Sequence, residues 1–370
     1  ASIEKVIPIA LRTNLLFSGL FTILAGFCPE MLMRIFTNDA ALVASGSQYL
    51  RAVALSYVLC GISQVYLILL KNTGHAAVSS RISSTAVVLN IILNAILIYG
   101  LCGAPALGIR GAAYATVAAR VVELIWAYLE TKKPERVRIL WNRLFSSAGK
   151  ILSEDFWRYT LPVLAASLVW GIAYVLYSVI MGHMGSDAVA ANSITSIAKS
   201  LLSCLIRGVS GGAGVLIGNL LGANELEKAR EYGGRLSHLS IAIGIVTGGL
   251  LMLISPAIVH FAPLSDTAAE YLQYMLLFCG LNLMAQSVNT TVLDGIFCAG
   301  GDAKFDMQGN IGAMWCFSVP LGFLAAFWLK LPVMVVYCIV NLDEIVKLPA
   351  VYHHYKKYIW VRNITRDIED

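Results

Sequence analysis

Charge is what this sequence has least of. Only 13 % of its 370 residues are charged, against about 25 % in a typical soluble protein, while 58 % are hydrophobic. The mean hydropathy is +0.73. A water-soluble fold of this length cannot bury so much apolar surface, so the composition excludes a soluble protein and predicts one embedded in a lipid bilayer.

Several motifs that carry chemistry are also missing. The eight cysteines lie in or beside apolar runs without CxxC spacing, and the six histidines lack ligand spacing, so we expect no disulfide framework and no metal site. No GxxxxGK[ST] phosphate loop occurs, which excludes ATP hydrolysis by this chain. No cluster of His, Asp and Ser suggests catalytic residues. We therefore expect a protein that is not an enzyme and has no cofactor.

Long apolar runs dominate what remains. They are too long and too continuously apolar for the alternating strands of a membrane barrel, so they predict an all-α polytopic membrane protein. Ten spanning helices are expected, near residues 6–33, 44–70, 80–101, 109–130, 156–181, 189–221, 236–260, 268–298, 307–329 and 331–352.

Basic residues predict the orientation. The net charge of +5 does not indicate nucleic acid, because Lys and Arg lie between apolar segments rather than along one face. A cation-rich segment at the middle of the chain marks the cytoplasmic side, and six later helices return the basic C-terminus there. We expect a multi-pass protein of the cytoplasmic membrane with a cytoplasmic C-terminus. The mid-chain cations are Lys132, Lys133, Arg136, Arg138, Arg143, Lys150 and Arg158.

An internal repeat suggests two lobes. Residues 1–133 resemble 226–357, whereas 155–225 has no counterpart near the start. We predict a partial N-terminal lobe of four helices (1–133), a basic cytoplasmic linker (134–154), a six-helix C-terminal lobe (155–357) and a cytoplasmic tail (358–370). Repeats of this kind occur in secondary transporters. The aligned pairs are Glu4-Lys5 with Glu227-Lys228, Tyr49-Leu50 with Tyr271-Leu272, Gly74 with Gly301, and Lys132-Lys133 with Lys356-Lys357.

Five segments together resemble the multidrug and toxic compound extrusion (MATE) family of bacterial type. The resemblance implies twelve helices in two lobes around a central cavity, and ion-driven export of small organic, often cationic, compounds. By its register, the first two helices of the family are missing here. We expect a monomer in the lipid bilayer. The segments are LGIRGAAYATVAARVVE, LPVLAASLVWG, GHMGSDAVAANSI, GVSGGAGVLIGNLLGANELEKAREY and LDGIFCAGGDAKF.

Asn90 and Asn94 are the sharpest polar signal inside an apolar run. At i and i+4 both carboxamides lie on one helix face, and their burial is unfavourable without partners. They are either contacts between helices or part of a functional site. The resemblance implies an ion-coupling network of this pair with Thr116 and an aspartate of the absent first helix, and a coupling ion that is H⁺ or Na⁺. Asn94 stands where an aspartate is common in the family.

Charged pairs within the helices are a second signal. Arg120 and Glu123 are three residues apart and can pair on one face, as can Glu344 and Lys347 in the last helix. Pairing for stability is the default interpretation. Because charge inside a membrane is a functional hypothesis in itself, Glu123 is a candidate for ion coupling after the asparagines.

The second lobe departs from the family pattern. By the resemblance, other members carry carboxylates at the position of Trp170, or of Ser167 in the register of another branch, and at that of Ser287, so a sodium site there is not expected. Trp170 and Tyr174 either stack on flat cationic substrates or serve as packing residues. Asp294 is interpreted as a solvated charge at a helix end, with titration in the cavity as the alternative. The candidate cavity-lining residues are Trp170, Tyr174, Ser287 and Asp294.

A glycine stripe in the same lobe predicts close helix packing. Gly208, Gly212, Gly214, Gly218 and Gly222 recur at helical spacing and leave one face bare for a neighbouring backbone.

A secondary antiporter that works by alternating access fits these observations best. A flippase for lipid-linked oligosaccharides or lipids is the alternative, and it would require a larger, more cationic cavity. A membrane-embedded enzyme would require a convergent catalytic cluster, and a channel would require a filter-like loop. The sequence shows neither.

Overall fold

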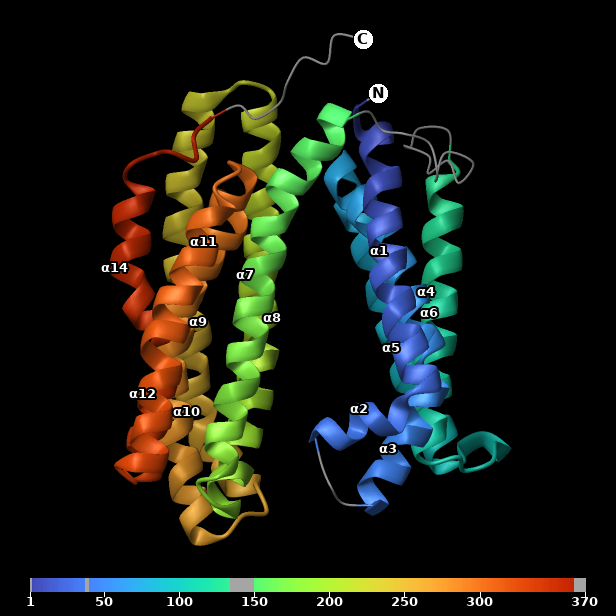
Figure 1. The fold of residues 1–370 in the computed structure, drawn as a ribbon, viewed down its shortest axis with the longest axis vertical. Coiled ribbons are helices and arrows are strands. Elements are labelled where there is room, and N and C mark those ends of the chain that lie inside the picture. Colours follow the sequence, from blue (N-terminus) through green and yellow to red (C-terminus); the bar gives the residue numbers. More distant parts are fainter. Residues whose placement is uncertain (1, 37–39, 134–149, 363–370) are drawn as a thin grey trace. The chain divides into compact units, whose positions relative to one another are not determined.

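A computed structural model describes residues 2–36, 40–133 and 150–362. Within these ranges the regular elements are all helices, which confirms the predicted all-α membrane fold. The helices divide into two compact units, unit 1 (Ala1–Phe156) and unit 2 (Trp157–Asp370), and Figure 1 draws both. Each unit is described by itself.

Unit 1 is a helical bundle. Helix α6 packs against α5, α4 and α3, and α1 packs against α4. The short helix α2 lies across the direction of the long helices at one end of the bundle (Figure 1). The elements are α1 (Ser2–Phe27), α2 (Pro29–Phe36), α3 (Ala40–Val53), α4 (Leu55–Leu70), η1 (Lys71–His75), α5 (Ala76–Tyr99), η2 (Leu101–Gly103) and α6 (Ile109–Thr131).

Unit 2 is organised around α10, which packs against α8, α9 and α14. The stretch Asp266–Phe297 comprises α10 and the segment that follows it. In its apolar 18-residue portion 67 % is buried, a larger share than in any other spanning stretch described. The elements are α7 (Lys150–Gly182), α8 (Ser186–Gly222), α9 (Leu226–Phe261), α10 (Asp266–Thr290), η4 (Thr291–Phe297), α11 (Ala303–Asn310), η5 (Ile311–Ser318), α12 (Val319–Phe323), η6 (Leu324–Trp328), α13 (Val333–Val340) and α14 (Asp343–Tyr355).

Eight helical stretches of the described residues are long and apolar enough to cross a membrane, against ten predicted. The stretch Leu55–Tyr99 accounts for two predicted helices, because the backbone leaves helical geometry at Thr73 and Gly74. The predicted helix 331–352 is divided between Val340 and Asp343 into α13 and α14, and neither piece is long enough to span alone. Apolar side chains such as Leu253 and Leu201 point outward, as a lipid environment permits.

Two predicted boundaries differ from the structure. Of the predicted linker 134–154, residues 134–149 lie outside the described residues, and α7 already begins at Lys150. The predicted tail, described as far as residue 362, starts as a packed segment. Trp360 is fully buried, and Arg362 donates to the carbonyl oxygens of Gly300 at 3.0 Å and Gly301 at 2.9 Å.

Candidate functional site

The structure brings together the three polar residues predicted in unit 1. Asn94 on α5 donates to the Oδ1 of Asn90 at 3.1 Å, and Asn90 donates to the Thr116 hydroxyl on α6 at 3.4 Å. The Thr116 hydroxyl donates in turn to the carbonyl oxygen of Ala112. The Oδ1 of Asn94 is buried and has no partner among the described residues. This cluster therefore retains one free acceptor for a proton donor or a cation.

Glu123 lies on the same helix as Thr116, two turns further along. Its side chain is 1 % exposed, and one carboxylate oxygen accepts from Arg120. The other oxygen is buried without a partner in the described part of the chain. A half-satisfied buried carboxylate is unfavourable unless it gains a proton or a cation.

The most elaborate polar arrangement lies in unit 2. Charged and amide side chains surround a cavity of about 360 Å³, in the size range of small-molecule sites. Three carboxylates and two cationic groups face it. The charged, amide and indole side chains of the lining are Trp170 (α7), Arg207 (α8), Gln286 and Asn289 (α10), Asp294 (η4), Asp306 and Asn310 (α11), and Glu344 and Lys347 (α14).

One side of the cavity is a buried network across α10 and α14. Asn289, 1 % exposed, donates to both the backbone oxygen and the Oε2 of Glu344, at 2.7 and 2.8 Å. Lys347 donates to the Oε1 of Glu344 at 3.0 Å and lies 3.9 Å from Asp343. The pair that sequence spacing predicts in the last helix is thus formed, and both side chains are buried. Such a pair is tolerated in the interior only when its remaining polar atoms also have partners.

Helix α11 extends this network. Lys347 also donates to the Oδ1 of Asn310 at 3.1 Å, and the Asn310 amide donates to Asp306 at 3.0 Å. Helix α11 is held against α14 by His354, which lies 2.6 Å from Asp302 and stacks on Phe305. These contacts fix Asp306 and Asn310 beside Lys347.

Asp294 has the exposed side chain that a solvated charge requires, but it does not lie at a helix end. The helix does not end there, because α10 continues into the π-helical segment η4, and π-helical turns are often found at functional sites. Gly295 lets η4 approach α8 closely, since a Cβ at this position would lie 2.8 Å from the Ser210 carbonyl oxygen. Asp294 therefore faces the cavity. It makes no hydrogen bond or ion pair with any described residue.

The aromatic candidates lie on α7. Trp170 lines the cavity, and the ring of Tyr174 stacks on the indole of Trp170 with ring centroids 5.5 Å apart. The guanidinium of Arg207 lies 5.6 Å from the Trp170 ring centroid. Tyr174 itself faces a smaller neighbouring pocket near Lys199, which donates to Asn282 at 2.9 Å.

Ser287 does not line the cavity. It is 1 % exposed, and its hydroxyl donates to the carbonyl oxygen of Ser240 on α9 at 2.7 Å. The reason is the close packing of α9 on α10, where a Cβ at Gly244 would lie 3.1 Å from the Cβ of Ser287.

Sequence reasoning missed Asn289, Asp306 and Asn310 as site residues. Asn289 carries the same signal as Asn90, an amide inside an apolar run, and Asp306 and Asn310 are an i, i+4 polar pair. What the sequence does not show is that three helices bring them together. No group of three or more His, Cys, Asp or Glu residues suited to hold a metal occurs in the part of the chain that the structure describes.

Comparisons with known proteins identify the family to which this sequence is similar. The MatE family model matches residues 2–96 and 162–324. An uncharacterized transporter of Bacillus subtilis, YisQ, is 20 % identical over 97 % of this chain and 78 % of that relative. The probable multidrug resistance protein YoeA of the same organism is 23 % identical over 94 % of this chain and 77 % of its own length.

Solved structures show the same fold. A MOP superfamily transporter from Pyrococcus furiosus superposes with a TM-score of 0.85 at 19 % identity, covering 97 % of this chain and 79 % of that one. A MATE in complex with MaL6 gives 0.83 at 20 % identity, covering 96 % and 79 %. The family match extends over helices of both units, and the chain therefore belongs to the MatE family and is a membrane transporter, not an enzyme.

Proposed function

We propose that this transporter exports small organic cations across the cytoplasmic membrane in exchange for protons. The observation that carries the proposal is Asp294, a carboxylate that faces a cavity inside a spanning bundle and has no hydrogen bond or ion pair with any described residue. Ionisable groups at such positions mark substrate and ion pathways. The names of YoeA and of NorM of Mannheimia succiniciproducens, both probable multidrug resistance proteins, support export of this kind.

The cavity lining suits a cationic substrate. Asp294, Asp306 and Glu344 outnumber Arg207 and Lys347, so the lining is negative overall when all five are charged. The indole of Trp170 offers a flat aromatic face to a planar cation. The flippase alternative requires an excess of cationic groups, which this lining does not have.

Lys347 favours H⁺ over Na⁺ as the coupling ion in this cavity. Its ammonium already contacts oxygens of Glu344 and Asn310 at 3.0 and 3.1 Å. The ammonium therefore occupies the position in which a sodium ion would coordinate these oxygens. A proton needs only one oxygen. Asp294 supplies one that is not engaged elsewhere.

Exchange then follows from competition at Asp294. The deprotonated carboxylate attracts the organic cation, and protonation removes that attraction and releases it. Because each occupant stabilises one access state over the other, proton flow biases the equilibrium between states that open on opposite sides of the membrane.

The unit 1 cluster is proposed as a second part of the coupling machinery. Asn90, Asn94 and Thr116 form a polar floor with one free acceptor, and Glu123 carries a half-satisfied carboxylate. We further propose that the protein acts as a monomer with its C-terminus on the cytoplasmic side. The basic mid-chain segment supports this orientation.

Proton release on substrate binding tests the proposal directly. Ethidium, a planar organic cation, is titrated calorimetrically into the purified chain in buffers that differ in ionisation enthalpy. At a pH low enough for Asp294 to be protonated before ethidium binds, we expect release of up to one proton per bound cation. Asp294→Asn should release none, because the two ligands compete for one carboxylate. Glu270→Gln, an exposed carboxylate of α10, is the matched control and should behave like the unaltered chain.

Transport in proteoliposomes completes the test. Ethidium movement should follow an imposed pH gradient and ignore a sodium gradient. Binding without proton release, or competition by Na⁺, would contradict the proposal, as would equal losses in the Asp294 and Glu270 variants.

A further inference from the structure

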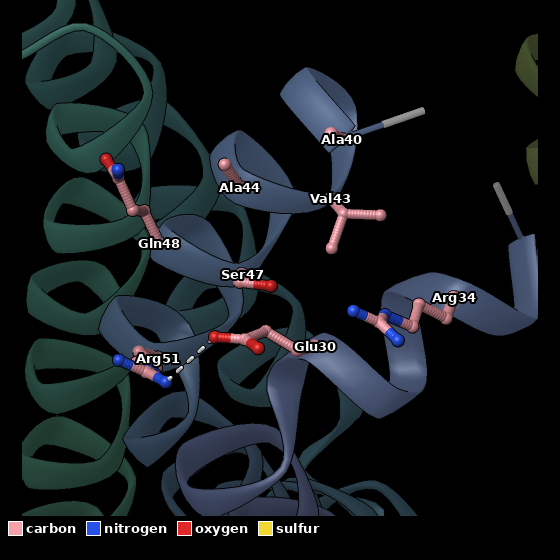
Figure 2. Close-up of a pocket in the computed structure, with 8 residues that line it drawn as sticks. All are labelled: Glu30, Arg34, Ala40, Val43, Ala44, Ser47, Gln48 and Arg51. Carbon is pink, nitrogen blue, oxygen red and sulfur yellow. Dashed lines mark ion pairs between the residues drawn. The ribbon is translucent and has the colours of Figure 1, made fainter. Parts of the chain in front are cut away.

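Unit 1 contains a second polar cavity that the proposed transport function does not use. It lies between α2 and α3, has a volume of about 590 Å³, and is lined by both signs of charge (Figure 2). Glu30 and Arg34 come from α2, and Ser47, Gln48 and Arg51 from α3.

The donors in this cavity are only partly used. Arg51 lies 3.6 Å from Glu30 in an exposed ion pair. Arg34 has no ion pair or hydrogen bond with any described residue. The carboxylate of Glu30 lies between the two guanidinium groups (Figure 2). One carboxylate and two guanidinium groups leave the lining with an uncompensated positive charge.

Ser47 is the most unusual member of the lining. It is 5 % exposed, and its hydroxyl has no partner among the described residues, although it points toward the side of the cavity where Glu30 and Arg34 lie (Figure 2). Ser18 and Thr22, in contrast, donate to carbonyl oxygens one turn back in α1, the usual solution inside a helix. A buried hydroxyl without a partner is unfavourable, and a ligand that accepts its proton would remove that penalty.

The cavity lies at the boundary between hydrocarbon and headgroups. The apolar span Val6–Phe27 ends just before α2, and the next span begins at Leu55 just after α3. Phe27 at the end of α1 and Met31 on α2 are strongly exposed, Met31 at 69 %. Residues directly beyond the ends of apolar spans lie at the depth of lipid headgroups.

We propose that this cavity binds the headgroup of a phospholipid that carries both a phosphate and a primary amine. Arg34 and the Ser47 hydroxyl donate to the phosphate, and the lipid ammonium donates to Glu30. The exposed side chains of Phe27 and Met31 contact the acyl chains. The placement of the individual charges, rather than the net charge of the lining, selects this occupant. A phosphate bound at Arg34 lies beside the Glu30 carboxylate, which a primary ammonium can bind in turn. An anionic lipid without an amine leaves Glu30 facing a phosphate, and a trimethylated amine has no N–H to donate.

Native mass spectrometry of the full chain with defined lipids tests this site. Phosphatidylethanolamine should be retained about tenfold more strongly than phosphatidylcholine or phosphatidylglycerol, the difference expected for one charge-assisted hydrogen bond. Arg34→Gln and Ser47→Ala should each remove most of this preference. Arg81→Gln, an exposed arginine of α5, is the matched control and should keep it.

Glu30→Gln separates recognition from misfolding. If Glu30 binds the amine, this variant should lose discrimination between phosphatidylethanolamine and phosphatidylglycerol. Its unfolding temperature in detergent should stay close to that of the unaltered chain, which shows that it has folded. Equal retention of all three lipids by the unaltered chain would overturn the proposal, because it would indicate annular lipid only. Persistence of the preference in Arg34→Gln would do the same.

Soluble competitors distinguish the source of the headgroup. Millimolar phosphoethanolamine and inorganic phosphate should fail to displace the lipid, because they lack the acyl chains. Displacement by phosphoethanolamine would assign the cavity to a soluble phosphate compound and overturn the lipid assignment.

Discussion

At the scale of single residues, Lys347 holds the unit 2 network together. It is buried, and its ammonium contacts Glu344 and Asn310 and lies 3.9 Å from Asp343. Removing one member of a buried ion pair leaves the other charge uncompensated, which typically costs about 3–5 kcal/mol, whereas removing both is far less harmful.

We therefore expect Lys347→Met to lower the apparent unfolding temperature strongly, and Glu344→Gln combined with Lys347→Met to restore much of the loss. Tryptophan fluorescence during heating in detergent measures both. If the double variant were as unstable as the sum of the two single variants, the pair would not be the energetic unit that its geometry indicates.

The hydrogen bonds of Asn289 allow a second prediction about stability. Its amide donates twice to Glu344, so Asn289→Ala leaves two buried acceptors without these bonds, at about 1–3 kcal/mol for such a group. The exposed Asn219 of α8 offers a control, and Asn219→Ala should change stability by only a few tenths of a kcal/mol. Thermal unfolding of the two variants side by side provides the measurement. Similar shifts would mean that the Asn289 bonds are weak.

Asn94 tests whether the unit 1 cluster is more than a contact between helices. Interhelical hydrogen bonds in membranes contribute only about 0.6–2 kcal/mol, so Asn94→Ala should cost little stability. If the cluster couples ions, ethidium efflux should nevertheless fall about tenfold, as loss of one coupling contact predicts. Thr85→Ala, exposed on the same helix, should leave efflux intact. Unchanged efflux for Asn94→Ala would reduce the cluster to a structural contact.

The sequence predicts some of these residues and not others, for a geometric reason. Asn90 and Asn94 share a helix face by spacing alone, so their contact is predictable. The contacts of Asn289 with Glu344 and of Lys347 with Asn310 depend on how three helices pack, which no local spacing contains. Ser287 failed as a cavity residue for the same reason, since α9 covers it.

At the scale of helices, the glycine stripe of α8 marks close packing along only part of its length, where α8 contacts η4 near Gly214. A Cβ at Gly208 or Gly212 would meet nothing within 4 Å, and one at Gly214 would make only ordinary contact with Gly295. The crossing between α9 and α10 is tighter, since a Cβ at Gly248 would lie 2.3 Å from the carbonyl oxygen of Gly280. The spacing of glycines shows that one helix face lacks side chains, but it does not show whether another helix packs against that face.

This crossing makes a sharp prediction. Gly248→Ala forces a methyl group into a backbone carbonyl, which cannot move without separating α9 from α10, so we expect severe destabilisation or loss of folded protein. Gly249→Ala, the adjacent residue, meets no atom within 4 Å and should be neutral or stabilising by about 0.5–1 kcal/mol, the usual gain for alanine in a helix. Yield and unfolding temperature of the two variants distinguish them. Equal behaviour would show that the helices part easily.

Helix irregularities also escaped sequence analysis. The boundaries of α6 follow the predicted range 109–130 closely, because Gly108 and the basic segment limit a simple apolar run. In contrast, η4 adds π-helical turns within a run that reads as one continuous helix. These turns alter the register after Thr290, and with it the direction of Asp294 relative to α10.

At the scale of the whole molecule, the apolar composition is sufficient to predict a protein embedded in lipid, and the long apolar runs predict that it is all-α. The internal repeat has a local counterpart in the backbone, because the aligned glycines Gly74 and Gly301 both have positive φ, 84° and 71°. Each stands where one long helix gives way to the next, in a conformation that glycine adopts without strain. A glycine with positive φ between consecutive helices therefore recurs at the aligned position in both units.

The repeat and the basic residues together predict one topology. If the mid-chain basic segment is cytoplasmic, the turn after α5 lies outside, the turn between α8 and α9 lies inside, and the turn between α9 and α10 lies outside. Lys228, Arg230 and Arg235 follow the inside turn, whereas Ala262–Ser265 carries no cation. The cavity between α2 and α3 then faces the outer leaflet.

Fusions to alkaline phosphatase, which is active only outside the cytoplasm, measure this topology. We expect high activity for fusions after Gly103 and after Pro263, and low activity after Asn224 and at the C-terminus, where a fused fluorescent protein should fold instead. Because every spanning helix reverses the side, an error in a single span would invert all later fusions together. High activity at Asn224 with low activity at Pro263 would reverse the orientation of unit 2 and refute the cytoplasmic C-terminus.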